Sequence, residues 1–156
     1  MKRYPKPALF SPHHPQKYAG DLSQIILRSA LEKRFALWCD RNPSVEKWVS
    51  EELIVPYISP LDGEKHRYFI DFRIWVRDKS SALKEYWVEI KPKYETLPPV
   101  PAQKATAKAR ARLLEEQQTW AVNRAKWDAA DSAAASMGAK FLVITDEDLG
   151  VDRSKN

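Results

Sequence analysis

The chain has 156 residues, of which 44% are hydrophobic and 30% are charged, and its formal net charge is +5. This length and composition are typical of one globular domain, and the single cysteine, Cys39, excludes an internal disulfide and a cysteine-based zinc site. The mean hydropathy of −0.56 argues against a membrane-spanning helix, and the basic N-terminus lacks the apolar core of a secretory signal. A single cysteine favours a reducing compartment, the cytosol.

The positive charge is concentrated in two segments. Residues 1–20 carry four basic and no acidic side chains, and residues 91–112 carry six basic side chains and one acidic one. Such concentrated charge favours a polyanionic partner. Basic tails and basic helix faces are also common on proteins that bind no polyanion, so charge alone leaves both interpretations open.

The N-terminal segment, residues 1–20, is rich in proline, lysine and histidine and shows no periodicity. The sequence therefore predicts a basic flexible arm there. A first helix follows, because Ser29 and Glu32 have capping-box spacing and the apolar residues after them fall on one helix face. Asn42-Pro43 is predicted to end this helix.

Three strand-like segments come next, at residues 48–57, 66–76 and 85 to about 91. In the second and third segments, apolar and polar residues alternate with the period of a β-strand. Short polar turns at residues 60–63 and 78–81 separate the segments. Short connections of this kind favour an antiparallel meander.

The last third of the chain predicts a long helical segment and a final strand. Four prolines between residues 92 and 101 break regular structure, and strong helix formers then dominate residues 102 to about 137, as one helix or two, with Gly138 as the C-cap. The apolar run at residues 141–144 predicts a buried strand, and residues 145–148 are typical of a helix start. The order α-β-β-β-α-β predicts an α/β fold, a mixed sheet flanked by helices.

One constellation within these strands carries chemistry: Asp71, then Glu89 and Lys91. The two carboxylates fall on neighbouring predicted strands, and Lys91 shares the face of Glu89 because strand side chains alternate. Mg²⁺ binds one or two carboxylates together with water and phosphate oxygens, and a bound cation lowers the pKa of an attacking water. A lysine there can hold or activate this water, or stabilise developing negative charge. The pattern predicts phosphodiester hydrolysis, with the Ile90 backbone carbonyl as a further candidate metal ligand.

An alternative is the polar face of an antiparallel sheet, on which Arg73 and Lys91 would form cross-strand ion pairs with the two carboxylates. A charged group inside an aromatic strand is costly unless it is paired or bound to metal. Glu-x-Lys by itself is a weak signal. The full spacing, with both carboxylates on adjacent predicted strands after a helix that carries Glu32, favours a site.

These residues resemble a known superfamily. Asp71 with Glu89-Ile90-Lys91 resembles the core motif of the PD-(D/E)xK nucleases, and Arg28-Ser29-x-x-Glu32 resembles their TnsA-type endonuclease branch. Longer runs resemble the head completion nucleases of tailed bacteriophages. These runs are residues 66–72, 88–93, 120–127 and 145–150, and the similarity as a whole covers roughly residues 16–150. The proline that precedes the aspartate in the general signature is Ile70 here.

The resemblance implies a restriction-endonuclease-like core, with a nuclease domain at residues 21–150 and a frayed tail at 151–156. It also implies metal-dependent DNA hydrolysis by activated water, without a covalent intermediate, in phage head completion and head–tail joining. The implied cofactor is Mg²⁺, for which Mn²⁺ would substitute. No nucleotide cofactor and no membrane are expected.

By this resemblance, Asp71 and Glu89 would be metal ligands and Lys91 the catalytic lysine. Glu32 would be a further catalytic acid near the metal, acting on it through water. The alternative for Glu32 is the capping box, in which its carboxylate accepts a hydrogen bond from the Ser29 backbone amide.

Several basic residues are predicted to contact DNA phosphates without reading sequence; these are Lys93, Lys104, Lys108, Arg110 and Arg112. His66 is either a further phosphate contact or a simple strand-end histidine. Gln118 and Lys126 either face the site or belong to a solvated helix face. Besides DNA, the resemblance implies phage portal or neck proteins as partners, and the host cytoplasm during assembly as the location, with retention in the virion also open.

Two other functions stay open. One is a TnsA-like transposon-end nuclease, although such proteins usually need a partner transposase and carry a further C-terminal domain, whereas this chain ends soon after its last predicted strand. The other is a head–tail joining protein that binds DNA without cutting it. The intact carboxylates argue against this second function, because DNA binding gains nothing from carboxylates near phosphate.

Overall fold

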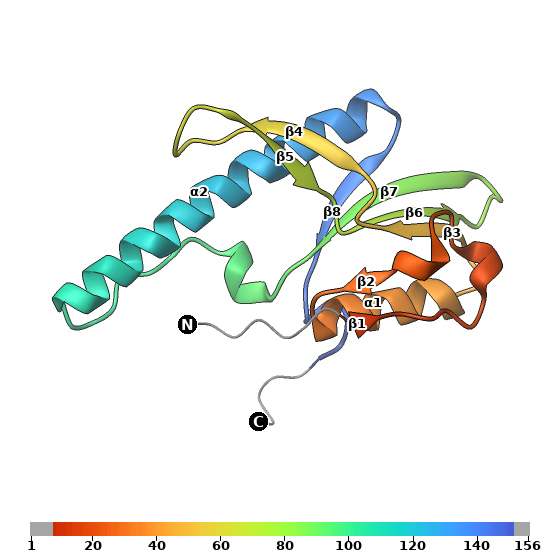
Figure 1. The fold of residues 1–156 in the computed structure, drawn as a ribbon, viewed down its shortest axis with the longest axis horizontal. Helices are drawn as coiled ribbons and strands as arrows, with labels where there is room; N and C mark the ends of the chain where they lie inside the picture. The colour runs from red at the N-terminus through yellow and green to blue at the C-terminus, as the bar shows by residue number, and fades with distance from the viewer. Residues whose placement is uncertain (1–7, 152–156) are drawn as a thin grey trace.

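A four-stranded mixed sheet forms the centre of the computed structural model, which describes residues 8–151. The strand order is β3-β6-β7-β8, and the strands span Val45–Ser50, Phe72–Arg77, Leu83–Ile90 and Lys140–Ile144. The first three pair antiparallel, whereas β8 pairs with β7 in parallel. Helices α1 (Ala30–Arg41) and α2 (Ala107–Ser136) flank the sheet (Figure 1). The predicted α/β class with a mixed, flanked sheet is confirmed.

The two faces of the sheet belong to two hydrophobic cores, because side chains alternate along each strand. Phe72 and Val88 pack with Phe35 of α1 in the first core. Trp87 packs with Trp127 of α2 in the second. Burial of each such side chain contributes about 1.5–3 kcal/mol. By the same alternation, Glu89 faces the α2 side of the sheet.

The predicted strands at 48–57 and 66–76 are wrong as continuous elements, since each divides into two. The outer halves, β4 (Ile54–Ile58) and β5 (Lys65–Phe69), form a separate antiparallel hairpin. At the first break Glu51 has a φ of 54°, which redirects the chain out of the sheet. The hairpin then buries apolar and aromatic side chains against α2, and this burial opposes the cost of the break.

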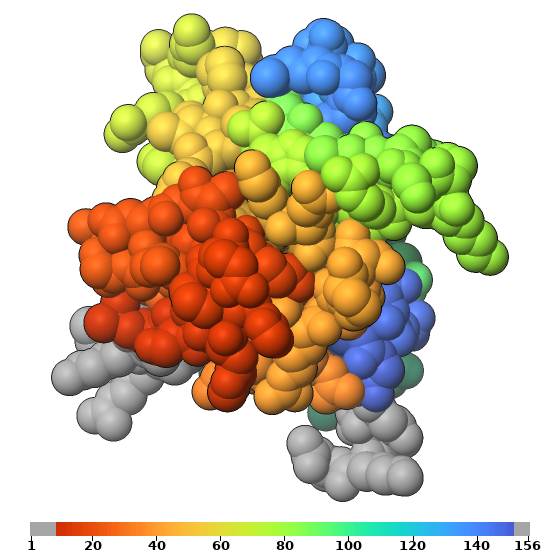
Figure 2. Space-filling view, turned by 90° about the vertical axis from the view of Figure 1, so that its right-hand side faces the viewer, coloured from red at the N-terminus to blue at the C-terminus, as the bar shows by residue number. Residues whose placement is uncertain are grey.

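The predicted flexible arm is wrong for residues 8–20, and residues 1–7 lie outside the described residues. Strand β1 (Ala8–Leu9) pairs with β2 (Ile26–Leu27), and the 3-10 turns η1 and η2 span Pro15–Lys17 and Leu22–Gln24. Phe10 and Tyr18 are buried, with ring centroids 5.9 and 4.7 Å from that of Trp48. In Figure 2 this segment, in red, lies directly against the orange segment that follows it.

Of the two alternatives for the last third of the chain, one helix or two, the structure has one: α2 is a single helix of 30 residues. It begins at Ala107 rather than at Ala102. The Thr106 hydroxyl caps its start by accepting a hydrogen bond from the backbone N–H of Ala109 at 3.1 Å. At its other end Gly138 has a φ of 75°, which suits glycine after a helix. Buried residues occur only in its second half among the described side chains, and the first half projects from the body (Figure 1).

The segments beside the sheet differ from prediction in two places. Strand β8 is half-buried, because it forms an edge of the sheet. The predicted helix start at residues 145–148 is wrong: the segment is a turn in which the Thr145 backbone N–H donates to Asp148 Oδ2 at 2.8 Å. A short 3-10 turn, η3 (Lys93–Thr96), follows β7. Within residues 8–151 no helix has the length and apolar character needed to cross a membrane.

Candidate active site

Asp71 and Glu89 come together where β6 begins and β7 ends. Phe72 of β6 pairs with Val88 of β7, so continuing this antiparallel register by one residue places Asp71 opposite Glu89. The Asp71 carboxylate accepts a hydrogen bond from the Ile90 backbone N–H, with Oδ2 2.8 Å from the nitrogen. The Ile90 carbonyl leaves the strand on this same edge, because one strand residue directs its N–H and C=O to the same side.

Glu89 is held from two sides. Its side chain is buried, and its Oε2 accepts a hydrogen bond from the Tyr68 hydroxyl at 2.5 Å. The Lys91 Nζ lies 3.6 Å from Glu89 Oε1. The Lys91 backbone N–H donates to the Ile144 carbonyl at 3.0 Å, so β8 fixes the end of the strand that presents the lysine.

Glu32 lies at the start of α1, inside a capping arrangement. The Ser29 hydroxyl accepts a hydrogen bond from the Glu32 backbone N–H at 3.1 Å. The Glu32 carboxylate accepts a hydrogen bond from the backbone N–H of Arg28 at 2.9 Å. The capping-box alternative predicted the Ser29 backbone N–H as this donor, and that donor was wrong.

Sequence reasoning missed an ion pair beside Glu32. The Arg28 Nε lies 2.8 Å from Glu51 Oε1, and the Glu51 backbone N–H donates to the Asp71 carbonyl at 3.1 Å. Arg28 belongs to the motif that resembles the TnsA-type branch, and this motif was the sequence feature that could have drawn attention to the ion pair. Glu51 has no periodic signature, because its position depends on the break after β3.

The acidic side chains repel one another. Burial, followed by the charges of Glu89 and Glu32, raises the pKa of Asp71 well above its ordinary value of 3.8. Burial, followed by the charges of Glu51 and Glu89, also raises the pKa of Glu32. A cluster in which two carboxyls resist ionisation is stabilised by any cation that enters it.

The lysine and the tyrosine of the cluster differ in charge at neutral pH. Burial by itself would lower the pKa of Lys91, but the charges of Glu89, Glu95 and Asp71 outweigh it and raise the pKa. Lys91 is therefore a cation at neutral pH. Burial and the Glu89 charge raise the pKa of Tyr68, which stays a neutral hydrogen-bond donor.

The donors of this cluster fit a hard divalent cation. Oδ2 of Asp71 accepts the Ile90 hydrogen bond and Oε2 of Glu89 accepts the Tyr68 hydrogen bond, while Glu89 Oε1 lies 3.6 Å from the Lys91 ammonium. A cation would bind the remaining lone pairs of these carboxylates together with the Ile90 carbonyl. Mg²⁺ commonly takes one or two carboxylates and completes its shell with water and phosphate oxygens. Across residues 8–151 no group of three or more His, Cys, Asp or Glu side chains is arranged to hold a metal ion. The protein ligands that fit are thus two carboxylates and one carbonyl, and a role for Glu32 stays a prediction.

A second lysine, Lys126 of α2, also lies near the cluster. Its Nζ is 5.6 Å from the ring centroid of Tyr68 and 5.8 Å from that of Tyr57. Burial lowers its pKa, and the charges of Glu89, Lys91 and Asp71 also act on it. Sequence reasoning left its orientation open, since its direction depends on how α2 lies across the sheet.

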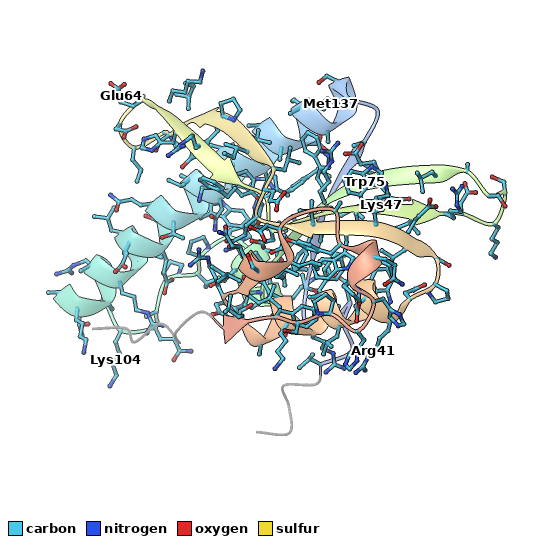
Figure 3. All side chains as sticks on the ribbon, turned by 45° about the vertical axis from the view of Figure 1, so that its right-hand side comes forward. Arg41, Lys47, Glu64, Trp75, Lys104 and Met137 are labelled. Carbon is cyan, nitrogen blue, oxygen red and sulfur yellow. The ribbon has the colours of Figure 1, made fainter. Side chains whose placement is uncertain are left out.

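The residues predicted to bind DNA have other surroundings. His66 contacts Asp62 in the hairpin, with Nε2 2.7 Å from Oδ2. Lys93 is exposed, with its Nζ 3.8 Å from Glu147 Oε2. The other four lie just before or within the projecting half of α2, where Figure 3 shows Lys104 at the opposite end of the helix from Met137; they are Lys104, Lys108, Arg110 and Arg112.

A hollow of about 670 Å³ opens between the η3 loop and α2, with Tyr94 and Trp120 among its lining residues. The lining includes neither carboxylate of the cluster and neither lysine. The carboxylates instead lie where β6 begins and β7 ends. The hollow therefore does not mark the candidate active site.

The mixed sheet, the flanking helices and the paired carboxylates with a lysine two residues beyond define a class of DNA-cutting enzymes. The chain belongs to the family of TnsA-like endonuclease N-terminal domains, whose family model matches residues 42–146. This match includes Asp71, Glu89 and Lys91 but begins after Glu32.

A particular relative is also similar along nearly the whole chain. The chain is 44% identical over 138 residues to the head completion nuclease of Enterobacteria phage T4. The aligned region covers 88% of this chain and 89% of the relative. No solved structure matches the chain.

Proposed function

We propose that this protein is a metal-dependent DNA nuclease that hydrolyses phosphodiester bonds with activated water. The observation that carries the proposal is the convergence of Asp71, Glu89 and Lys91 at one end of the sheet: Asp71 accepts the backbone N–H of Ile90, the residue between Glu89 and Lys91, and the Lys91 Nζ lies 3.6 Å from Glu89 Oε1. The family match supports nuclease activity on independent grounds. Metal dependence rests on the chemistry of the donors.

Mg²⁺ is the proposed cofactor, with Mn²⁺ as a substitute. Asp71, Glu89 and the Ile90 carbonyl would hold it, and Glu32 would act on it through water. When bound, such a cation neutralises phosphate charge and lowers the pKa of a coordinated water. The raised pKa of Asp71 supports this assignment, because burial and the charges of Glu89 and Glu32 outweigh the opposing charge of Lys91.

The chain's own groups then divide the remaining work. Tyr68 holds the Glu89 carboxylate in place through its hydroxyl. In hydrolysis the water oxygen forms a bond to phosphorus while the bond to one bridging oxygen breaks, and that leaving oxygen takes up a proton. Because Lys91 is protonated, it donates hydrogen bonds to the phosphate and stabilises the negative charge that develops there. A protonated lysine cannot serve as the base.

The proposed biological role is phage head completion and head–tail joining. It is supported by the relative from phage T4, whose printed name is head completion nuclease, and by coverage of nearly all of both chains. The proposed partners are DNA and the portal or neck proteins of a virion, and the proposed location is the host cytoplasm during assembly. A TnsA-like transposon-end function also fits the family model, but the T4 relative favours head completion.

Digestion of plasmid and linear duplex DNA, with Mg²⁺ and with EDTA, tests this proposal. Wild type should cut in Mg²⁺ and lose activity in EDTA. Asp71→Asn, Glu89→Gln and Lys91→Ala should each lower the rate by roughly 100-fold or more, as removal of one catalytic group usually does. Lys140→Met, on the exposed start of β8, is the matched control and should cut like wild type.

Two results would contradict the proposal. Wild-type protein that binds DNA but does not cut it in any divalent metal would favour a joining protein without catalysis. Full activity in a clean preparation of Asp71→Asn would remove the proposed site.

A further inference from the structure

Lys126 is a half-buried cation without an anionic partner. Among residues 8–151 its ammonium makes neither a hydrogen bond nor an ion pair, and its contacts are the rings of Tyr57 and Tyr68. Cation–π contacts of this kind contribute about 0.5–2 kcal/mol. Removing an ammonium from water costs more than this unless an anion meets it.

The position of this cation relates it to the candidate active site. Tyr68, over whose ring the ammonium lies, donates its hydroxyl hydrogen bond to Glu89. The charges of Glu89, Asp71 and Lys91 all act on Lys126. Lys126 nevertheless forms no ion pair with either carboxylate, so its ammonium lies beside the cluster without neutralising it.

We propose that Lys126 binds the phosphate at the cleavage position, as a second cation across from Lys91. This inference rests on the proposed nuclease function. A DNA phosphate that reaches Glu89 and Lys91 brings the anion that Lys126 lacks. Lys91 comes from the end of β7 and Lys126 from the middle of α2, so the phosphate would meet ammonium groups from two separate elements.

The two tyrosines position this contact. Tyr57 of β4 and Tyr68 of β5 are both buried, and their rings limit the directions open to the Lys126 side chain. The hairpin therefore orients a lysine on α2 as well as a carboxylate on β7. Lys126 is a catalytic residue in this proposal, because it contacts the reacting phosphate. Tyr68 is a positioning residue.

Two variants and a control test the proposal. Lys126→Met keeps an aliphatic stem against the tyrosine rings but removes the charge, and Lys126→Arg keeps the charge. Lys140→Met removes an exposed lysine at the start of β8. Single-turnover cleavage, with protein in saturating excess over DNA, measures the chemical step. Fluorescence anisotropy with a labelled duplex in EDTA measures binding without metal.

Lys126→Met should slow the single-turnover step roughly 100-fold and weaken binding far less, since one contact among many is lost. Lys126→Arg should recover a substantial part of the lost rate, and Lys140→Met should match wild type in both assays. If Lys126→Met does not fold, Lys126→Gln replaces it in the same comparison with Lys126→Arg.

Three outcomes would overturn the inference. Folded Lys126→Met that cuts as fast as wild type would show that Lys126 does not contact the reacting phosphate, while the nuclease function would stand. Equal losses in the Arg and Met variants, with lower melting temperatures for both, would assign Lys126 a structural role. Wild-type protein that does not cut would remove the nuclease function and this inference with it.

Discussion

Asp71 carries a charge that its surroundings disfavour when no cation is present. Burial and the charges of Glu89 and Glu32 raise its pKa, and Glu32 is raised in a similar way. Folded protein therefore binds protons more tightly at these carboxyls than unfolded protein does. Their contribution to stability is fully present below the ordinary values of 3.8 and 4.5, and it is lost as the pH rises through the raised values.

Asp71→Asn should stabilise the metal-free protein although it slows cleavage. An asparagine oxygen can still accept the Ile90 hydrogen bond, and the repulsion from Glu89 disappears. We expect the free energy of unfolding in EDTA to rise by on the order of 1 kcal/mol at neutral pH. Thermal melts at a series of pH values should show the gain shrinking as the pH falls, because protonation of wild-type Asp71 removes the same repulsion.

Asp131→Asn is the control for this prediction, because Asp131 is exposed on α2. Its melting temperature should follow that of wild type at each of these pH values. A destabilised Asp71→Asn in EDTA would contradict the electrostatic account of the cluster.

At the scale of elements, the two strand breaks decide where the carboxylates lie. Glu51 follows β3 and Asp71 precedes β6, and the Glu51 backbone N–H donates to the Asp71 carbonyl across the breaks. The chain leaves the sheet at the first break, forms the hairpin, and returns at the second. Asp71 thus stands at the edge where β7 ends, and the hairpin supplies Tyr68 to Glu89.

The N-terminal segment is the second element whose role depends on tertiary contacts. The Lys17 Nζ donates to the backbone carbonyls of Cys39, Asp40 and Asn42 at 2.6, 2.9 and 2.8 Å, at the C-terminal end of α1. The Asp40 carboxylate accepts from the backbone N–H groups of His13 and His14. A cation at a helix C-terminus also complements the helix dipole.

Lys17→Met should therefore destabilise the fold by about 1.5–3 kcal/mol, the usual range for hydrogen bonds to a charged group. Cleavage below the melting temperature should stay near wild type, since about 15 Å of helix separates this end of α1 from Glu32. Chemical denaturation measures the loss, with Lys33→Met on the exposed face of α1 as the control. Equal stability of the two variants would show that this segment does not depend on Lys17.

At the scale of the whole molecule, α2 extends the surface available to DNA beyond the catalytic cluster. Its first half projects from the body and carries basic side chains (Figures 1 and 3). From Ala107 to Lys126 the helix rises roughly 28 Å, which equals about 8 base pairs of duplex. A duplex cut at the cluster could run along this projection.

Neutralising the four basic residues of this region should weaken DNA binding without changing the cleavage rate at saturating DNA. These residues are Lys104, Lys108, Arg110 and Arg112. The slope of log K against log salt concentration should become shallower by up to about 3–4, if each residue contacts one phosphate. Anisotropy titrations at several salt concentrations measure this slope. The control removes four exposed lysines elsewhere, Lys33, Lys47, Lys79 and Lys140. Equal slopes for the two variants would exclude the projection from the DNA interface.

Features that depend on local periodicity could be predicted from the residues alone. Alternation placed Glu89 and Lys91 on one strand face, the capping box began α1 at Ser29, and helix-forming residues specified α2. Tertiary structure alone decided the breaks at Glu51 and Asp71, the packing of Phe10 and Tyr18 on Trp48, and the approach of Tyr68 and Lys126 to Glu89. Backbone period and capping are set by neighbouring residues, whereas these contacts join residues far apart in the chain, and their free energy appears only when the two cores form.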